Sequence, residues 1–551
     1  MGVEDRWQSQ KYGRIKIITD VRAITLDNVI SVLKEAYAVH LLNRNRIKYL
    51  IEFDRGNQPR DYTKTIRPDI DADVQDNLAA EITEFKTSYK WGNPITYKQR
   101  ATFDTEENKA DSDNEGIAVI NEMLNEEHAF REDAELAYYV ETCGIGFQMV
   151  DIKRDVKYVS VFDLKTLSPL NTFVVHDNTI SHKPLMGVTY VYSENGDMHF
   201  TCVTDDRVYQ ILNLARIENG QLTGERDYVF GIRNGEMNPL HKVNIVEFER
   251  SYDRMGCWER QESELKNLNH LISDFTNNVE QDTQSLWWGD NLDLPEKTDA
   301  DGNVTGYQVP RSGGWILTSS GEQKKASVQP LVIQIQYASI LNNIRYRRDV
   351  IKQKCCVPVQ ASVGGGSTGT AMSMASGWDT AEIQAAKEES FVQAGKMAIL
   401  ELILTAVRES TDTPKDSPVL KLNYSDIQPN ILRDRNYDMA TKANTLATLM
   451  NCGIAPEHAI ECVKLFSDVN RVINDSQPYL DLYYDAKKAA IARTQSGEGS
   501  GINVDENGQV RQEKTGLQDT SMQASNSPIT GARETKTGGA NGKNVTKKSF
   551  Q

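Results

Sequence analysis

The chain of 551 residues is roughly three to four times as long as a typical single domain, which predicts at least two packed cores. Acidic residues outnumber basic ones, 78 to 62, giving a net charge of −16 that excludes tight wrapping of DNA or of an anionic membrane. Seven cysteines without a C-x-x-C pair exclude a disulfide scaffold and favour a reduced cytosol. The longest apolar stretch, residues 397–407, is too short to span a bilayer, so no membrane partner is expected.

Helical periodicity dominates the first 142 residues. Apolar residues recur at helical spacing over 26–52, with Asp27 as the expected N-cap, and a second helix is predicted over about 74–89. Residues 115–142 predict a further amphipathic helical region, which Gly144 and Gly146 should end.

From Phe147 to about Glu249 the pattern changes to short runs rich in Val, Tyr, Thr and Phe. Asn-Gly pairs at 195–196, 219–220 and 234–235 separate these runs and are typical of hairpin turns. The segment therefore predicts a β-rich subdomain.

Two apolar seams follow on otherwise polar helices. The first runs through Leu265, Leu268, Ile272, Phe275, Val279 and Leu286, and the second through Ile333, Tyr337, Ile340, Ile344 and Ile351. A loop and short-strand insert with three tryptophans separates them at about 287–327. Either a specific helix–insert–helix architecture or an ordinary helical hairpin with an inserted loop fits this pattern.

The remaining chain is predicted to hold a glycine-rich segment at 363–377, a long helix from about Trp378 to Arg408, and a small helical unit at 433–493. Beyond Ala492 the composition is dominated by Gly, Ser, Thr, Asn, Gln and Lys, which predicts a disordered tail.

The glycine-rich segment matches two catalytic patterns only in part. Gly364 and Gly369 fit a phosphate-binding loop, but Thr370 stands where the lysine that contacts the β- and γ-phosphates belongs. Ser367 fits G-x-S-x-G, yet a nucleophile elbow requires a buried strand before it and a histidine partner. A flexible loop is favoured, and a hydrolase using Ser367 stays as an alternative.

No metal or cofactor site is predicted. The adjacent Cys355 and Cys356 suit neither a tetrahedral zinc site nor an ordinary disulfide. His176 and His182 have no second ligand pair near them, so packing or surface roles are favoured.

A cluster of cations occupies the C-terminal turns of the second seam. It consists of Arg345, Arg347, Arg348, Lys352 and Lys354, with Asp349 as the one nearby acid. These side chains either pair with the helix dipole and with Glu262, Glu264, Asp274 or Glu280 of the neighbouring helix, or form a ring of positive charge facing a polyanion after assembly.

Five segments stand out in order along the chain: Gly92-Asn-Pro-Ile-Thr-Tyr97, the stretch from Asp133 to Phe147, Leu167–Phe173, Val243–Phe248 and Thr368–Met372. In this order they resemble the portal proteins of tailed bacteriophages, specifically the SPP1-type portal family. The fourth has Val-Asn where the family usually has Ile-Pro. Together the matches cover about residues 26–410.

The resemblance implies an α+β portal-type fold with a mixed wing, a helical stem, a small α/β clip insert, a helical crown and a disordered C-terminal tail. The implied boundaries are 1–255 for the wing (β-rich over 147–250), 256–286 and 328–354 for the stem helices, 287–327 for the clip, 355–369 for a tunnel loop, 370–432 for the long helix and return to the wing, 433–493 for the crown and 494–551 for the tail.

The implied function is a ring, of twelve subunits in typical members, at one capsid vertex of the virion. Double-stranded DNA would pass through it without sequence specificity during packaging and ejection. The implied partners are the terminase large subunit, a head–tail adaptor, and the major capsid and scaffolding proteins, with assembly in the host cytoplasm. No catalytic residue is expected, because a separate terminase would supply the energy. The alternative is another head–tail adaptor or structural virion protein.

The resemblance also places candidate contact residues. The tunnel loop would present Gln360, Ser362, Gly364, Gly365, Gly366, Ser367 and Thr368 to the DNA. The five cations of the second seam, or Lys324 and Lys325, would centre or slow the duplex. Trp287, Trp288 and Trp315 form either a landing surface for the motor or packing between subunits.

Overall fold

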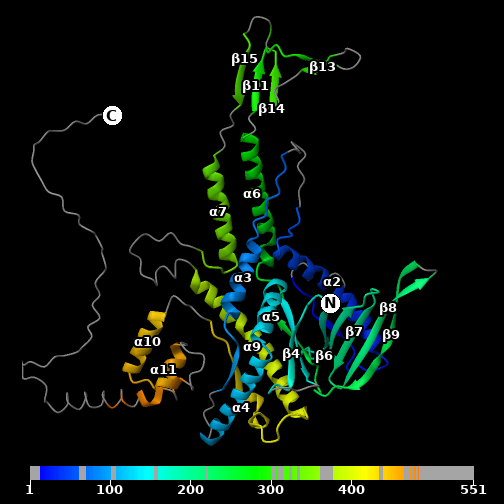
Figure 1. Ribbon diagram of the computed structural model, residues 1–551, viewed down its shortest axis with the longest axis vertical. Helices are drawn as coiled ribbons and strands as arrows, with labels where there is room; N and C mark the ends of the chain where they lie inside the picture. The colour runs from blue at the N-terminus through cyan, green and yellow to red at the C-terminus, as the bar shows by residue number, and fades with distance from the viewer. Residues whose placement is uncertain are drawn as a thin grey trace, which may run out of the picture. The chain divides into compact units, whose positions relative to one another are not determined.

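The computed structural model is mixed α+β (Figure 1). The residues that it describes are 13–60, 70–100, 107–153, 159–218, 221–283, 286–298, 304–307, 314–319, 321, 325–331, 336–359, 377–433, 439–463, 472–473, 476–479, 482 and 485. The chain divides into two compact units, residues 1–454 with 462–467, and residues 455–461 with 468–551. All elements below belong to the first unit except α11, part of which falls in the second.

The N-terminal helices form where apolar periodicity predicts them. They are α2 (Val29–Asp54), α3 (Leu78–Trp91), α4 (Glu107–Glu126) and α5 (Ala129–Cys143). The expected N-cap at Asp27 is wrong: α2 begins one residue later, with Asn28 at the cap position and its Oδ1 accepting from the Thr25 backbone. As predicted, α5 ends at Gly144, whose φ of +80° and close approach to the Arg254 carbonyl leave no room for a Cβ.

A six-stranded sheet with the order β1-β5-β6-β7-β8-β9 makes up most of the β-rich region. Its strands are β1 (Ile17–Thr19), β5 (Thr172–Asp177), β6 (Pro184–Tyr192), β7 (Met198–Thr204), β8 (Arg207–Glu218) and β9 (Gln221–Met237). All pairings are antiparallel except that of β1 with β5. Helix α2 covers one face, where Val29, Leu33 and Ala36 pack against Phe173 and Val188.

The three Asn-Gly pairs have different outcomes. Gly196, with φ +79°, forms the predicted turn between β6 and β7. The pair at 219–220 lies outside the described residues. The hairpin expected at Asn234-Gly235 is wrong, because Gly235 is an extra residue within β9, where Glu236 pairs with Val208 and Asn234 with Tyr209. Asn-Gly supplies the positive φ that a turn and a bulge both require.

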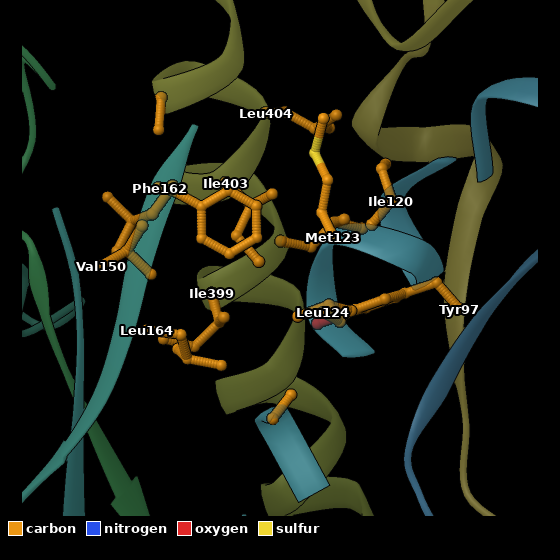
Figure 2. Close-up of a cluster of buried hydrophobic side chains, with 14 of the residues drawn as sticks. Tyr97, Ile120, Met123, Leu124, Val150, Phe162, Leu164, Ile399, Ile403 and Leu404 are labelled. Atoms are coloured by element: carbon orange, nitrogen blue, oxygen red, sulfur yellow. The ribbon is translucent and has the colours of Figure 1, made fainter. Parts of the chain in front are cut away.

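A second sheet, with the order β10-β3-β4, packs against the long helix α9 (Trp378–Glu409). Its strands are β3 (Ile145–Ile152), β4 (Phe162–Leu167) and β10 (Ile245–Glu249). Figure 2 shows the core between them, with Phe162 and Val150 on one side of Ile403 and Met123 of α4 on the other. By length and composition alone, helix α9 could cross a membrane. However, 56% of its apolar 18-residue stretch is buried inside the protein, as in the core helix of a globular domain.

The predicted helix–insert–helix order is present. Helix α6 (Glu262–Thr283) follows a short 3-10 turn, η1 (Glu259–Gln261), and leads into strands β11 (Leu286–Asp290), β12 (Glu296–Thr298), β13 (Val304–Tyr307), β14 (Gly314–Thr318) and β15 (Ser327–Leu331). A clip insert of α/β type was expected; the described residues of 286–331 contain strands and no helix. Helix α7 (Tyr337–Lys354) begins later than the expected residue 328, because Ser327–Leu331 pairs with β11 instead.

Short elements complete the described chain. After α9 come the 3-10 turns η2 (Pro418–Lys421) and η3 (Tyr424–Asp426), and β16 (Ile427–Asn430), which pairs with β2 (Thr96–Gln99). In the region expected as a crown, the structure describes helices α10 (Met439–Asn451) and α11 (Pro456–Val463). The expected tail, 494–551, lies outside the described residues.

Candidate functional site

Helices α6 and α7 lie side by side and share an apolar seam (Figure 1). Leu265, Leu268 and Ile351 are buried in one core cluster at the base of the pair, and Phe275 meets Tyr337 edge to face at 5.9 Å. On α7, Leu341 and Tyr346 are 39% and 68% exposed. The pair therefore buries one seam and leaves a further apolar and aromatic surface open on α7.

Two of the five cations on α7 pair with the neighbouring helix. Glu264, in the first turn of α6, lies 3.5 Å from an Arg347 nitrogen and 3.8 Å from the Lys354 Nζ. Among the acids expected as partners, Glu264 is confirmed, whereas Glu262 instead binds Arg46 of α2. All three side chains are between 38% and 46% exposed, so these contacts are weak.

Two further cations pair with residues far away in sequence. Arg348 donates to Asp76 at 2.5 Å and to Glu81, and Lys352 also donates to Glu81. Burial alone would raise the pKa of Glu81, but Lys352 and then Arg348 outweigh it and lower that pKa below its ordinary value. Arg348 and Lys352 therefore attach α7 to the start of α3.

Arg345 differs from the other four. Its side chain is exposed, and no hydrogen bond or ion pair links it to any part of the chain that the structure describes. It lies one helical turn from Arg348, whose charge is compensated. Within the described residues, Arg345 is thus the cation of this cluster that is available to an external anion.

A polar stripe on α6 holds the segment that leads into α3. Asn277, Ser273 and Asn269 accept from the backbone N–H groups of residues 72, 74 and 76 at 2.7, 3.0 and 3.0 Å. Four residues of helix rise about 6.0 Å and two residues of extended chain span about 6.6 Å, so the two repeats match. Sequence analysis missed this stripe, although its i, i+4, i+8 spacing was visible.

A buried ionic network lies among α3, α5, α9 and the end of β10. Lys90 and Arg250 each contact both Glu141 and Glu388. Burial alone would raise the pKa of Glu388, but Lys90 and Arg250 hold it well below its ordinary value. These four residues come from segments separated by up to 298 positions, and no local pattern in the sequence indicates their meeting.

The insert brings its tryptophans together by strand pairing. Trp287 and Trp315 are directly opposite each other on β11 and β14, and their rings stack at 5.9 Å with an interplanar angle of 18°. Trp288 points to the other face, where its Nε1 donates to the Thr318 hydroxyl at 2.9 Å. Lys325 is exposed, and Lys324 lies outside the described residues.

The predicted tunnel-loop residues, from Gln360 to Thr368, all lie outside the described residues. The chain is described again at Gly377. Immediately before the gap, Cys355 is buried, and burial raises the pKa of its thiol to about 12. Cys356 adopts a positive φ of 55°.

The two histidines with candidate metal-ligand spacing lie in different surroundings. His176 is buried in β5, 3.7 Å from Glu247, and His182 occupies a turn with a φ of 45°. Within the described ranges, no three His, Cys, Asp or Glu residues come together in a way that could hold a metal ion.

Comparison with protein families decides the assignment. The model of the phage portal protein family, SPP1 Gp6-like, matches residues 46–477, which is most of the chain. The chain belongs to this portal family. The portal protein is therefore a structural protein of a bacteriophage virion, as the five sequence segments predicted.

No curated protein matches the portal protein. Among solved structures, it is similar to a chain described as "Neck of empty GTA particle computed with C6 symmetry", with 10% identity and a TM-score of 0.37. That match covers 74% of the portal protein and 95% of the other chain.

Proposed function

We propose that the portal protein assembles into a closed ring, of twelve subunits, at one vertex of the capsid. Double-stranded DNA enters and leaves the capsid through its central channel. In this assignment residues 1–255 and 370–432 form the wing, α6 and α7 the stem, the 287–327 insert the clip, and 433–493 the crown. Assembly takes place in the host cytoplasm.

The observation that carries the proposal is the α6–insert–α7 arrangement with an open face on α7. A closed ring requires each subunit to present one surface to the neighbour before it and another to the neighbour after it. The seam around Phe275 and Tyr337 is used within the subunit. The exposed Leu341 and Tyr346 remain for a neighbouring subunit.

Electrostatics supports passage of DNA with little adhesion. A ring of chains with a net charge of −16 each repels a phosphate backbone overall, so the duplex slides without being held. Arg345 would add one localised positive charge per subunit facing the channel, which centres the duplex. Contacts of this kind read the backbone and not the bases, as a packaged genome of any sequence requires.

The proposal assigns no catalysis to this chain. Terminase would supply the energy of translocation and dock with its large subunit on the insert, and a head–tail adaptor would bind at the same end after packaging. The major capsid and scaffolding proteins would contact the wing. The tunnel loop, 355–369, would contact passing DNA.

Site-specific photo-crosslinking tests the channel directly. A photoreactive residue at position 345 should crosslink to DNA in filled particles and not in particles emptied of DNA. The same residue at position 180, at an exposed turn of the six-stranded sheet, is the control. Crosslinking at 180 but not at 345 would contradict the proposed orientation of α7.

A further inference from the structure

Helix α3 makes contacts at both of its ends with segments that are distant in sequence (Figure 1). Its N-terminal end and residues 72–77 before it contact α6 and α7. Its C-terminal half contacts the chain on both sides of residues 360–376, the segment that the structure does not describe.

At the N-terminal end, Asp76 joins the two stem helices. Its backbone N–H donates to Asn269 of α6 at 3.0 Å, and its carboxylate accepts from Arg348 of α7 at 2.5 Å. In the first turn of α3, Glu81 accepts from Arg348 and Lys352. A displacement of α6 relative to α7 therefore has to break these bonds or move the start of α3.

In the C-terminal half, Lys86 holds the chain just before the undescribed segment. Its side chain is 2% exposed, and its Nζ donates to the carbonyl of Cys356 at 3.3 Å. Cys356 has a positive φ, which residues other than glycine rarely adopt. On either side of it, Cys355 and Val357 are buried in the same core cluster as Ile82 of α3.

The same half of α3 also holds the chain just after that segment. Trp378, the first residue of α9, packs edge to face against Phe85 and Tyr89, with ring centroids 5.8 Å away in both cases. Tyr89 donates to Glu382, and Lys90 to Glu388, about one and three turns further along α9.

We infer that α3 is a rigid connector that couples the relative position of α6 and α7 to both flanks of residues 360–376. Directional bonds connect both ends of this 14-residue helix to its neighbours, partly buried at the N-terminal end and buried at Lys90 in the C-terminal half. A displacement of one end therefore breaks several bonds at once unless the helix moves with it. The coupling acts in both directions, since linkage between two sites is reciprocal. It is a property of the subunit and does not rest on the proposed passage of DNA.

Hydrogen–deuterium exchange of the full chain tests the inference, with neighbouring arginines of α7 as variant and control. Arg348→Ala removes contacts to Asp76 and Glu81, whereas Arg347→Ala removes a contact to Glu264 of α6. The expected result is that Arg348→Ala speeds exchange roughly threefold or more at residues 355–359 and 378–385, as well as at 72–81. Arg347→Ala should leave all three regions unchanged.

A reciprocal variant guards against simple loss of structure. Lys86→Met, which keeps an unbranched side chain one atom shorter but removes its bond to Cys356, should speed exchange at residues 72–76. If Arg348→Ala does not fold, Lys352→Met takes its place in the experiment, because it removes only one contact to Glu81.

Faster exchange confined to the side of the substitution, in both directions, would overturn the inference. The mass of the assembly is measured on the same samples, so that loss of ring formation is recorded separately from loss of coupling.

Discussion

Arg345 and Arg348 lie one turn apart on α7, but only the charge of Arg348 is neutralised by carboxylates of the same subunit. Arg348 bonds to two carboxylates at the start of α3, whereas Arg345 has no partner among the described residues. The cation cluster predicted from the sequence therefore divides into residues that hold the subunit together and one residue that is open to an external anion.

Arg345→Ala should leave the assembly intact while altering packaging or retention of DNA. The side chain is exposed and has no intramolecular bond to lose, so the melting temperature should stay close to that of the wild type. Arg348→Ala is the matched comparison, and it should lower the melting temperature because Asp76 and Glu81 lose their partner. Packaged DNA per particle and thermal melting of the purified protein measure the two effects. Rings lost in Arg345→Ala would show that this residue is structural.

The contacts of Glu81 should make stability depend on pH in the acid range. Lys352 and Arg348 lower the pKa of Glu81 in the folded state below the ordinary value of 4.5. The stabilisation is therefore complete above pH 4.5 and is lost as the pH falls through the lower folded-state pKa. Glu81→Gln should reduce the melting temperature at pH 7, and the difference from the wild type should shrink below pH 4.5. A difference independent of pH would rule out an ionic origin.

His40 predicts a second, separate pH dependence. Burial between α2 and the six-stranded sheet lowers its pKa from 6.5 to about 4, with Arg44 adding to the effect and a hydrogen bond to the Leu170 carbonyl opposing it. The fold keeps the imidazole neutral, so its stabilisation is full above pH 6.5 and decreases as the pH falls towards 4. At pH 5 the loss relative to pH 7 should be about 2 kcal/mol. Urea unfolding of the wild type and of His40→Gln at both pH values measures it; the same loss in the variant would contradict the assignment.

Removing Glu388 should destabilise the protein far more than removing an exposed carboxylate. Glu388→Ala leaves Lys90 and Arg250 buried with a single shared partner, Glu141, at a cost of about 3–5 kcal/mol. Glu401→Ala, on the exposed face of the same helix, removes only an exposed pair with Lys242 and should cost less than about 1 kcal/mol. Chemical denaturation of the two variants compares them, and equal destabilisation would show that burial does not set the energy of this network.

The sequence alone predicted the elements whose signal is local. Apolar periodicity located α2, α6 and α9, and Gly144 ended α5 where expected. The start of α7 was placed too early, because the choice between helix and strand at 328–331 depends on pairing with β11. Asn234-Gly235 was interpreted as a turn for a similar reason, since only the partner strand distinguishes a turn from a bulge.

The partners of the candidate site residues were less accessible to sequence reasoning. Glu264 was foreseen for Arg347 because both lie on neighbouring helices. Asp76 was not predicted as a partner of Arg348. The two residues are 272 positions apart and meet only because the segment leading into α3 packs against α7. The family resemblance located the tunnel loop, the stem and the clip, and these assignments remain predictions.

The measurement that tests the ring most directly is electron microscopy of the purified protein, with its mass determined in parallel and with scaffolding protein added. The proposal predicts rings with a central hole and a mass near that of twelve chains of 62.0 kDa each. Monomers or open filaments, persisting in the presence of scaffolding protein, would contradict it.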